Sequence, residues 1–286
     1  MSKEKKLPKE YAIVVSLMIF FAVVTIVGSV RLWIVTSNSF NSVDLAEVEI
    51  LEQDTNIDIE SYNLRIINTI KDAYGIDVYY GDKLNVESVG AVPLTNEQQV
   101  FNMLKEVVET LSKYPRNLFK EIESKEYSVA IYLVDYFTIN VEALANRNTI
   151  GQFKIYMSDT TNLERALHHE NYHILDYYIK LEADEGLAYI DWSKYNPKGY
   201  TYPQNVDSIT SKYTYNGEPG ANFVTTYAKC SQKEDRAETF AEMIMADRSE
   251  IFFNDGEPIK GKIDIIREVL EDTFVTVRNS NNLAWE

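Results

Sequence analysis

All three histidines of this chain lie in one short segment, LHHENYH at residues 167–173. His169 and His173 are four residues apart, so on a helix their rings project from one face and can bind the same metal ion. Glu170 directly follows the first of them, where its carboxylate can reach a metal-bound water molecule. An ordinary helix with surface histidines is the alternative, but it gives no reason for every histidine to gather here.

A catalytic zinc ion needs a third protein ligand, with the fourth position open for water. No other histidine remains, and the single cysteine, Cys230, offers no metal-binding cluster, so the ligand must be a carboxylate. The best candidate lies in KEDRAETFAEMI (233–244), where Glu234 and Glu238 share one face of a predicted helix with two alanines. Ser231 and Glu234 also match a capping box, which would make Glu234 merely close the helix N-terminus. The residues alone leave both possibilities open.

The order H-E-x-x-H and then E-x-x-A-E resembles the gluzincin metallopeptidases, most closely the lethal-factor-like and Pro-Pro-endopeptidase-like group. In that group a tyrosine stands seven residues before the ligand glutamate, and Tyr227 stands seven residues before Glu234. The resemblance covers roughly 161–180 and 223–245, and the segment between them is longer than in the best-known members. It implies a zincin-like metallopeptidase domain.

Carried over to this chain, the resemblance implies that His169, His173 and Glu234 bind one Zn²⁺ per chain. Glu170 would be the general base for the attacking water and then the general acid toward the leaving amine. Tyr227 would donate a hydrogen bond to the developing oxyanion.

Two further carboxylates are expected around these ligands. Glu238 would accept a hydrogen bond from a ligand imidazole and hold it in the required tautomer. Asp176 lies on the same helical face as both histidines and could do likewise, with a solvated helix end as its alternative. We expect His168 to pack or lie on the surface, and Cys230 to be a buried, inert thiol.

The elements that must position these residues follow from hydrophobic periodicity. Helices are predicted over about 59–74, 95–114, 161–180, 232–247 and 262–274, and strands over 76–80, 127–134 and 152–157. Few strands before a helical second half favour an α+β fold, with a small sheet and an active-site helix, over a doubly wound sheet. The strand at 152–157 precedes the active-site helix and is the candidate edge for pairing with an extended peptide substrate, as zincins commonly do.

The N-terminus predicts a membrane location. Ala12–Val30 carries no charge and would be about 28 Å long as a helix, enough to cross a hydrocarbon core. Four lysines precede it, and only Arg31 follows it before Arg65, so the positive-inside rule places the N-terminus in the cytoplasm. Cleavage as a signal peptide, giving a secreted protein, is the alternative. The formal net charge of −16 argues against a nucleic-acid partner, because phosphate binding needs a surplus of Lys and Arg.

The chain is therefore expected to have four parts. They are a cytoplasmic N-terminus (1–11), a transmembrane signal anchor (12–35), an acidic stalk (36–56) and an extracellular zinc metallopeptidase domain (57–286). The predicted function is a membrane-anchored zinc endopeptidase, a hydrolase that cleaves an extracytoplasmic protein or peptide with a metal-activated water. The alternative is a non-catalytic zinc-fold module that binds or regulates at the cell surface. The presence of Glu170 and Tyr227 favours catalysis, because a non-catalytic descendant needs neither.

Overall fold

The computed structural model describes the chain from residue 58 to residue 285, apart from short internal segments. Those segments are 124–126, 140–142, 148–150, 160–161, 183–187, 204–215, 217, 247–249, 251–252 and 282. The predicted cytoplasmic N-terminus, anchor and stalk lie outside the described residues. Among the residues that are described, no helix is both long enough and apolar enough to cross a membrane.

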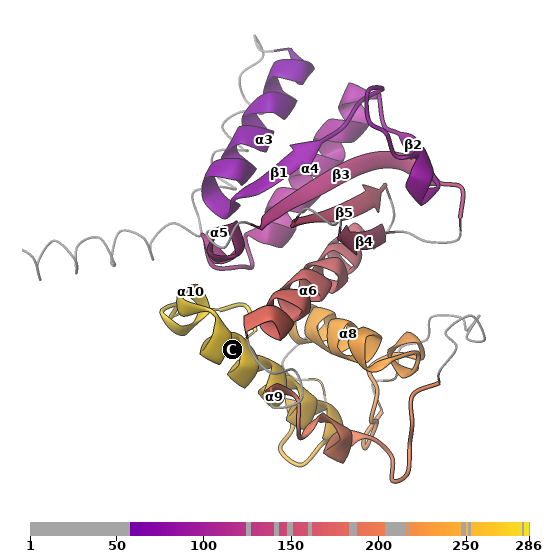
Figure 1. Cartoon of the computed structure of the whole chain (residues 1–286), viewed down its shortest axis with the longest axis vertical. Coiled ribbons are helices and arrows are strands. Elements are labelled where there is room, and N and C mark those ends of the chain that lie inside the picture. The colour runs from indigo at the N-terminus through magenta and orange to yellow at the C-terminus, as the bar shows by residue number, and fades with distance from the viewer. Residues whose placement is uncertain are drawn as a thin grey trace, which may run out of the picture. The chain divides into compact units, whose positions relative to one another are not determined.

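The described chain opens with helix α3, Ile59–Tyr74, followed by strand β1, Ile76–Tyr79 (Figure 1). Asp58 caps the start of α3 by accepting a hydrogen bond from the Ser61 amide. Gly75 ends the helix in the left-handed conformation, with φ 78°, which glycine adopts without the steric cost of a Cβ atom. The predicted helix and strand are both confirmed.

Five strands of the described chain form one mixed sheet in the order β1-β3-β5-β4, with β2 also paired to β3. The further strands are β2 Ala91–Pro93, β3 Ser128–Phe137, β4 Ala143–Arg147 and β5 Gln152–Ser158. The strands β1, β3 and β5 run parallel, whereas β2 and β4 run antiparallel to their neighbours. Val78, Ile131 and Ile155 are register partners across the three parallel strands, and all three are buried in the main core.

The edge strand beside the predicted active-site helix is β4, and the expectation that 152–157 forms this edge is wrong. β5 covers those residues and is paired on both sides, parallel to β3 and antiparallel to β4. β4 has the sequence ALANR, and alanine and asparagine are poor strand formers, so local propensity does not predict it. Its strand conformation comes from pairing with β5.

The helices follow the predicted order with two changes at their starts. The longer helices are α4 Glu97–Leu111, α6 Leu163–Glu182, α8 Gln232–Met245 and α9 Pro258–Thr273. The short ones are α5 Leu118–Glu123 and α10 Val275–Arg278, with single 3₁₀ turns at η1 Glu87–Val89, η2 Trp192–Tyr195 and η4 Tyr227–Lys229. The helix expected from about residue 95 begins at Glu97 with Asn96 as its cap, and α9 starts before residue 262 because Pro258 is suited to the first turn of a helix. A small sheet with a helical second half confirms the α+β class.

Helix α6 is the centre of the arrangement. It contacts β4 and β5 and packs against α8 (Figure 1). Tyr172 of α6 lies against Phe240 of α8, with ring centroids 4.7 Å apart. His168 is fully buried on α6 and its Nδ1 lies 2.7 Å from the Tyr114 hydroxyl, so of the two expected locations, the packed interior and the surface, it occupies the first.

Two buried ion pairs fix the first turns of α8. Asp235 pairs with Lys262 of α9 at 2.6 Å, and neither side chain is exposed. The next residue, Arg236, pairs with Asp176 of α6 at 2.8 Å. These contacts set the position and rotation of the helix turn that also carries Glu234.

Breaking the Asp235–Lys262 pair tests how much α8 depends on it. Lys262→Met leaves a buried carboxylate without its cation, so we expect the free energy of unfolding to fall by about 3 to 5 kcal/mol. Asp235→Asn combined with Lys262→Met removes both charges and should lose much less. Urea denaturation followed by tryptophan fluorescence measures both variants. A double variant as unstable as the single one would contradict the role given to this pair.

Candidate metal centre

The two histidines of the H-E-x-x-H segment lie on the face of α6 that is turned toward α8. His169 is buried and His173 is partly buried. Their Nε2 atoms are 3.0 Å apart. The four-residue spacing therefore brings both ring nitrogens to one point, as the sequence predicted.

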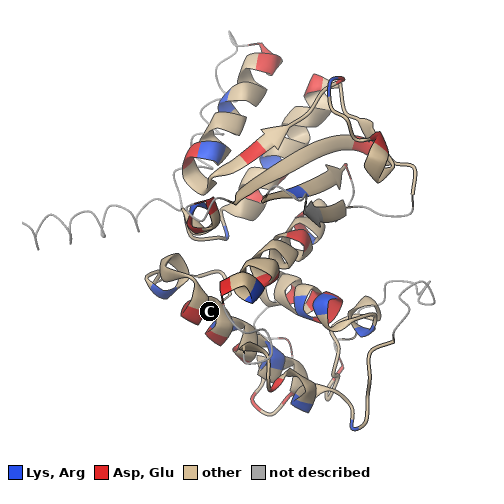
Figure 2. Ribbon diagram, in the orientation of Figure 1, with Lys and Arg blue, Asp and Glu red and all other residues tan. Residues whose placement is uncertain are grey.

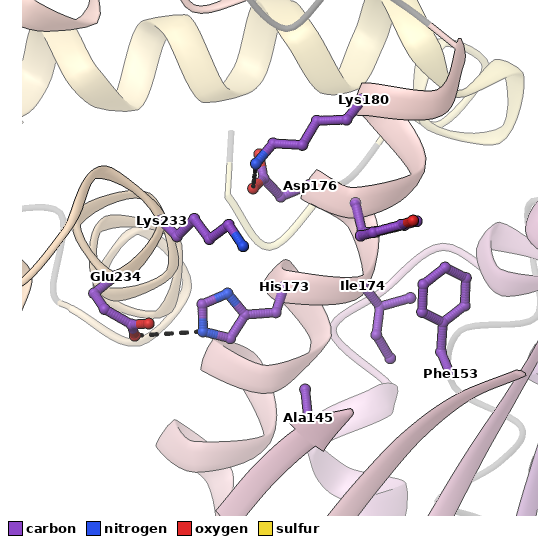
Figure 3. A pocket seen from close by; sticks show the side chains of 9 residues that line it. Ala145, Phe153, His173, Ile174, Asp176, Lys180, Lys233 and Glu234 are labelled. Carbon is purple, nitrogen blue, oxygen red and sulfur yellow. Dashed lines mark ion pairs between the residues drawn. The ribbon is translucent and has the colours of Figure 1, made fainter. Parts of the chain in front are cut away.

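Glu234, in the first turn of α8, brings its carboxylate to the same point. Its Oε2 lies 3.1 Å from Nε2 of His169 and 3.4 Å from Nε2 of His173 (Figure 3). Ser231 does cap α8, because its hydroxyl accepts a hydrogen bond from the Glu234 amide at 3.2 Å. The backbone of Glu234 thus takes part in capping while its carboxylate faces the two imidazoles.

The spacing of the three donor atoms fits a metal ion. About 3.3 to 3.4 Å separates two ligand atoms at tetrahedral corners about 2.0 to 2.1 Å from one zinc ion. The three separations here are 3.0, 3.1 and 3.4 Å. Oε2 of Glu234 is also buried without a well-directed hydrogen bond within the described structure, so its lone pairs are free for a cation. His169, His173 and Glu234 are therefore a fitting set of ligands for one divalent metal ion.

The electrostatics of the centre favour a positive charge between these side chains. Burial disfavours a charged His169, but the neighbouring carboxylates of Glu234 and Glu238 outweigh burial and raise its pKa to about 10. Burial likewise opposes ionisation of Glu234, yet the two imidazoles hold its pKa well below the usual range. In the metal-free protein a proton on His169 occupies the role that a metal cation would take.

Glu238, one helical turn after Glu234, makes the contact that was predicted for it. His169 Nδ1 donates to Glu238 Oε1 at 2.8 Å, which leaves Nε2 of the same ring for a metal. Burial would raise the pKa of Glu238, but the hydrogen bond to His169 and the charge of Arg165 lower it to about 2. The carboxylate therefore stays ionised and holds the tautomer that metal binding requires.

Two residues that sequence reasoning missed hold Glu238 in place. Arg165 donates to Glu238 Oε2 at 2.8 Å and to Glu242 Oε2 at 2.7 Å. Thr225 donates to the same Glu238 oxygen at 2.7 Å. Arg165 lies four residues before His169, and this spacing could have predicted that the two side chains share one face of the helix. Nothing in the local sequence singles out Thr225.

Tyr227 lies at the start of η4, beside the centre. Its ring centroid is 6.0 Å from that of His169, and the side chain is partly exposed. Burial, followed by the charge of Glu234, raises the pKa of the Tyr227 hydroxyl well above 10, so the group keeps its proton at neutral pH and can donate a hydrogen bond. The amide of Ala228 donates to the Thr225 hydroxyl at 3.0 Å, which links η4 to the Glu238 cluster.

Asp176 does not hold an imidazole, which corrects its predicted role. Its Oδ2 accepts hydrogen bonds from Arg236 at 2.8 Å and pairs with Lys180 at 3.2 Å. The alternative of a solvated helix end is also wrong, because Asp176 is buried. It shares a face with the histidines, but it lies two turns beyond His169 and less than one turn beyond His173, where it contacts Arg236. Cys230 is buried as expected, and burial raises the pKa of its thiol.

A cavity of about 360 Å³ lies beside the metal centre (Figure 3). It is lined by Ala145, Phe153, His173, Ile174, Asp176, Tyr177, Lys180, Lys233 and Glu234. Ala145 belongs to the edge strand β4 and the others to β5, α6 and α8. The cavity thus joins the metal ligands to the sheet edge, and it provides space for part of a bound molecule next to the centre.

No protein-family model matches this chain, and no curated protein matches it in sequence. Among solved structures, it is similar to a candidate zinc-binding metallo-peptidase from Bacteroides caccae, with 17% identity and a TM-score of 0.43. The aligned region covers 77% of this chain and 88% of the other. A TM-score below 0.5 does not establish a common fold, so the assignment of the centre rests on its own geometry.

Glu238 and Glu242 form a matched pair for testing the orientation of His169. Both lie on α8 and both bind Arg165, but only Glu238 touches the imidazole. We expect Glu238→Gln to weaken zinc binding about 10- to 100-fold, because glutamine lacks the negative charge and can turn its NH₂ group to the ring, so the tautomer is no longer fixed. Glu242→Gln should weaken it far less. Competition with a chromophoric chelator measures both affinities, and equal losses would contradict the role of Glu238.

Metal binding should release a proton. Because the pKa of His169 is about 10, its ring is protonated near neutral pH and zinc must displace that proton. We expect about one proton or more to be released per zinc near pH 7, with apparent affinity rising about tenfold per pH unit. Calorimetry in buffers of different ionisation enthalpy measures the release. Heats that are independent of the buffer would contradict this prediction.

Proposed function

We propose that this chain is a zinc-dependent peptidase, with one zinc ion held by His169, His173 and Glu234. The observation that carries the proposal is the meeting of three donor atoms at ligand spacing, with Glu170 directly beside the first ligand. Two imidazoles and one carboxylate are a known ligand set for catalytic zinc, which leaves one coordination position open.

The proposed chemistry is hydrolysis of a peptide bond. A bound zinc ion would act as a Lewis acid on the substrate carbonyl and lower the pKa of a water molecule at its open position. The hydrogen bond from Nδ1 of His169 to Glu238 supports this set of ligands, because it leaves Nε2 of the same ring to bind the metal.

In the proposed reaction Glu170 would transfer protons and Tyr227 would stabilise the developing oxyanion. The negative charge of Glu170 contributes to the raised pKa of both His169 and Tyr227, which agrees with a position near both groups. Its carboxylate would accept a proton from the attacking water and then deliver that proton to the leaving amine nitrogen. The protonated hydroxyl of Tyr227 would donate a hydrogen bond to the carbonyl oxygen as negative charge develops there.

The amino-acid sequence supports more specific proposals about the location, the peptidase group and the substrate. The uncharged stretch Ala12–Val30 and the lysines before it support an endopeptidase anchored in the cell membrane, with its catalytic domain outside. The spacing between Tyr227 and Glu234 supports a gluzincin of the lethal-factor-like and Pro-Pro-endopeptidase-like group. The substrate would then be an extracytoplasmic protein or peptide.

Two substitutions separate catalysis from binding alone. Glu170→Gln removes the proton acceptor but no ligand, so we expect zinc to be retained at about one per chain while peptide cleavage is lost. His169→Ala removes a ligand, so zinc and cleavage should both be lost. Metal content by atomic emission and cleavage of a broad peptide library provide the two measurements.

The possible outcomes are distinct. Stoichiometric zinc without cleavage of any library peptide would favour the non-catalytic zinc module. Failure of the wild-type chain to bind zinc would exclude both functions. Unchanged cleavage by Glu170→Gln would show that another group accepts the proton.

A further inference from the structure

The cavity beside the metal centre has an apolar side and a charged side. Ala145 of β4, Phe153 of β5 and Ile174 of α6 form the apolar lining. Lys180, Lys233 and Asp176 bring charges to the opposite part, as Figure 3 shows. A volume of about 360 Å³ lies within the range of ligand sites, about 300 to 1,000 Å³.

The cavity is lined by two lysines, Lys180 and Lys233, and by two carboxylates, Asp176 and Glu234, and Glu234 faces the imidazoles of the metal centre. Asp176 is already paired through Oδ2, which lies 2.8 Å from the buried Arg236 and 3.2 Å from Lys180. Lys233 is exposed, and no carboxylate among the described residues lies within ion-pair distance of its ammonium group. Lys233 is thus a cation of the cavity that has no ion-pair partner in the described part of the chain.

The position of Lys233 directs this charge toward a bound molecule. It directly precedes the proposed ligand Glu234, and in Figure 3 its side chain extends from α8 across the space beside His173. The N-terminus of α8 adds partial positive charge from the helix dipole. The chain as a whole has 44 acidic and 28 basic residues, and Figure 2 shows both kinds mainly on helices and turns. The net charge of the chain is negative, so the charge of Lys233 beside the centre is opposite in sign to the net charge of the chain.

We propose that this cavity binds a carboxylate of the peptide substrate next to the bond held at the metal centre, with Lys233 as its cationic partner. The apolar lining would take the aliphatic part of the same residue. This inference rests on the proposed peptidase function and names its substrate class, a peptide with a carboxylate at that position. The carboxylate can come from an acidic side chain or from a free C-terminus.

The first test compares cleavage of matched peptides by the zinc-loaded full chain in detergent. The probes are a blocked peptide library in which one position at a time is fixed as Glu or as Gln. We expect Glu to be preferred at one position near the scissile bond by about tenfold or more, because an ammonium–carboxylate hydrogen bond is stronger than a neutral one. In Lys233→Gln the ratio of Glu to Gln cleavage should fall to about one.

Lys83→Gln is the matched control. Lys83 is exposed and does not line the cavity, and its replacement changes the net charge by the same amount. The Glu preference should persist in this variant, and the zinc content of both variants should equal that of the wild type. A ratio that falls equally in both variants would show a general charge effect and overturn the proposal.

A binding test does not need turnover. Calorimetry with the zinc-loaded Glu170→Gln protein compares the Glu peptide with its Gln counterpart, and peptides with a free C-terminus with C-terminal amides. A preference for Glu in blocked peptides assigns the cavity to a side chain, whereas a preference that needs the free C-terminus assigns it to a terminal carboxylate.

The two proposals fail in different ways. Carboxylate preference in binding, lost in a variant that adds Lys233→Gln, supports the cavity assignment even where no peptide is cleaved and the peptidase proposal fails. Cleavage with equal rates for Glu, Gln, acid and amide peptides leaves the peptidase proposal intact and overturns the cavity assignment. Absence of both binding and cleavage overturns both.

Discussion

The packing of α6 against α8 is the constraint on which the rest of this structure depends. The two imidazoles come from α6 and the third donor from α8, so a small rotation of either helix would separate the three atoms. Salt bridges across this contact oppose such a rotation: Arg236 binds Asp176, and Arg165 binds Glu238 and Glu242. Because these side chains are largely buried, their geometry is held more firmly than that of exposed pairs.

The same contact gathers an unusual amount of negative charge in a buried place. Glu170, Glu234 and Glu238 all lie beside His169, and removing carboxylates from water is unfavourable unless cations or hydrogen bonds offset the loss. Arg165 and the two imidazoles offset part of it in the metal-free protein. A divalent cation would offset it more completely, which gives a physical reason for the cluster beyond the stability of the fold.

The histidines of the centre could be predicted because they are rare and close together, whereas the residues alone left Glu234 open between a metal ligand and a helix cap. His169 and His173 fall on one helical face by spacing alone, and periodicity predicted the helices that carry them and Glu234. What could not be predicted depends on long-range packing. The strand β4 exists through its pairing with β5, and Asp176 meets Arg236 because α8 crosses α6 at that level. Thr225 reaches Glu238 only in the folded chain. Residues 1–56, for which a cytoplasmic N-terminus, anchor and stalk are predicted, lie outside the described structure.

X-ray absorption at the zinc edge of the zinc-loaded chain can test whether His169, His173 and Glu234 bind the metal, because it reports the atoms bound to the metal itself. We expect four nearest neighbours at about 2.0 to 2.1 Å, all nitrogen or oxygen, with the outer-shell scattering of two imidazole rings. His173→Ala should remove the contribution of one ring. A six-coordinate shell of oxygen atoms alone, or a spectrum unchanged by His173→Ala, would contradict the assignment of His169, His173 and Glu234 as the metal ligands.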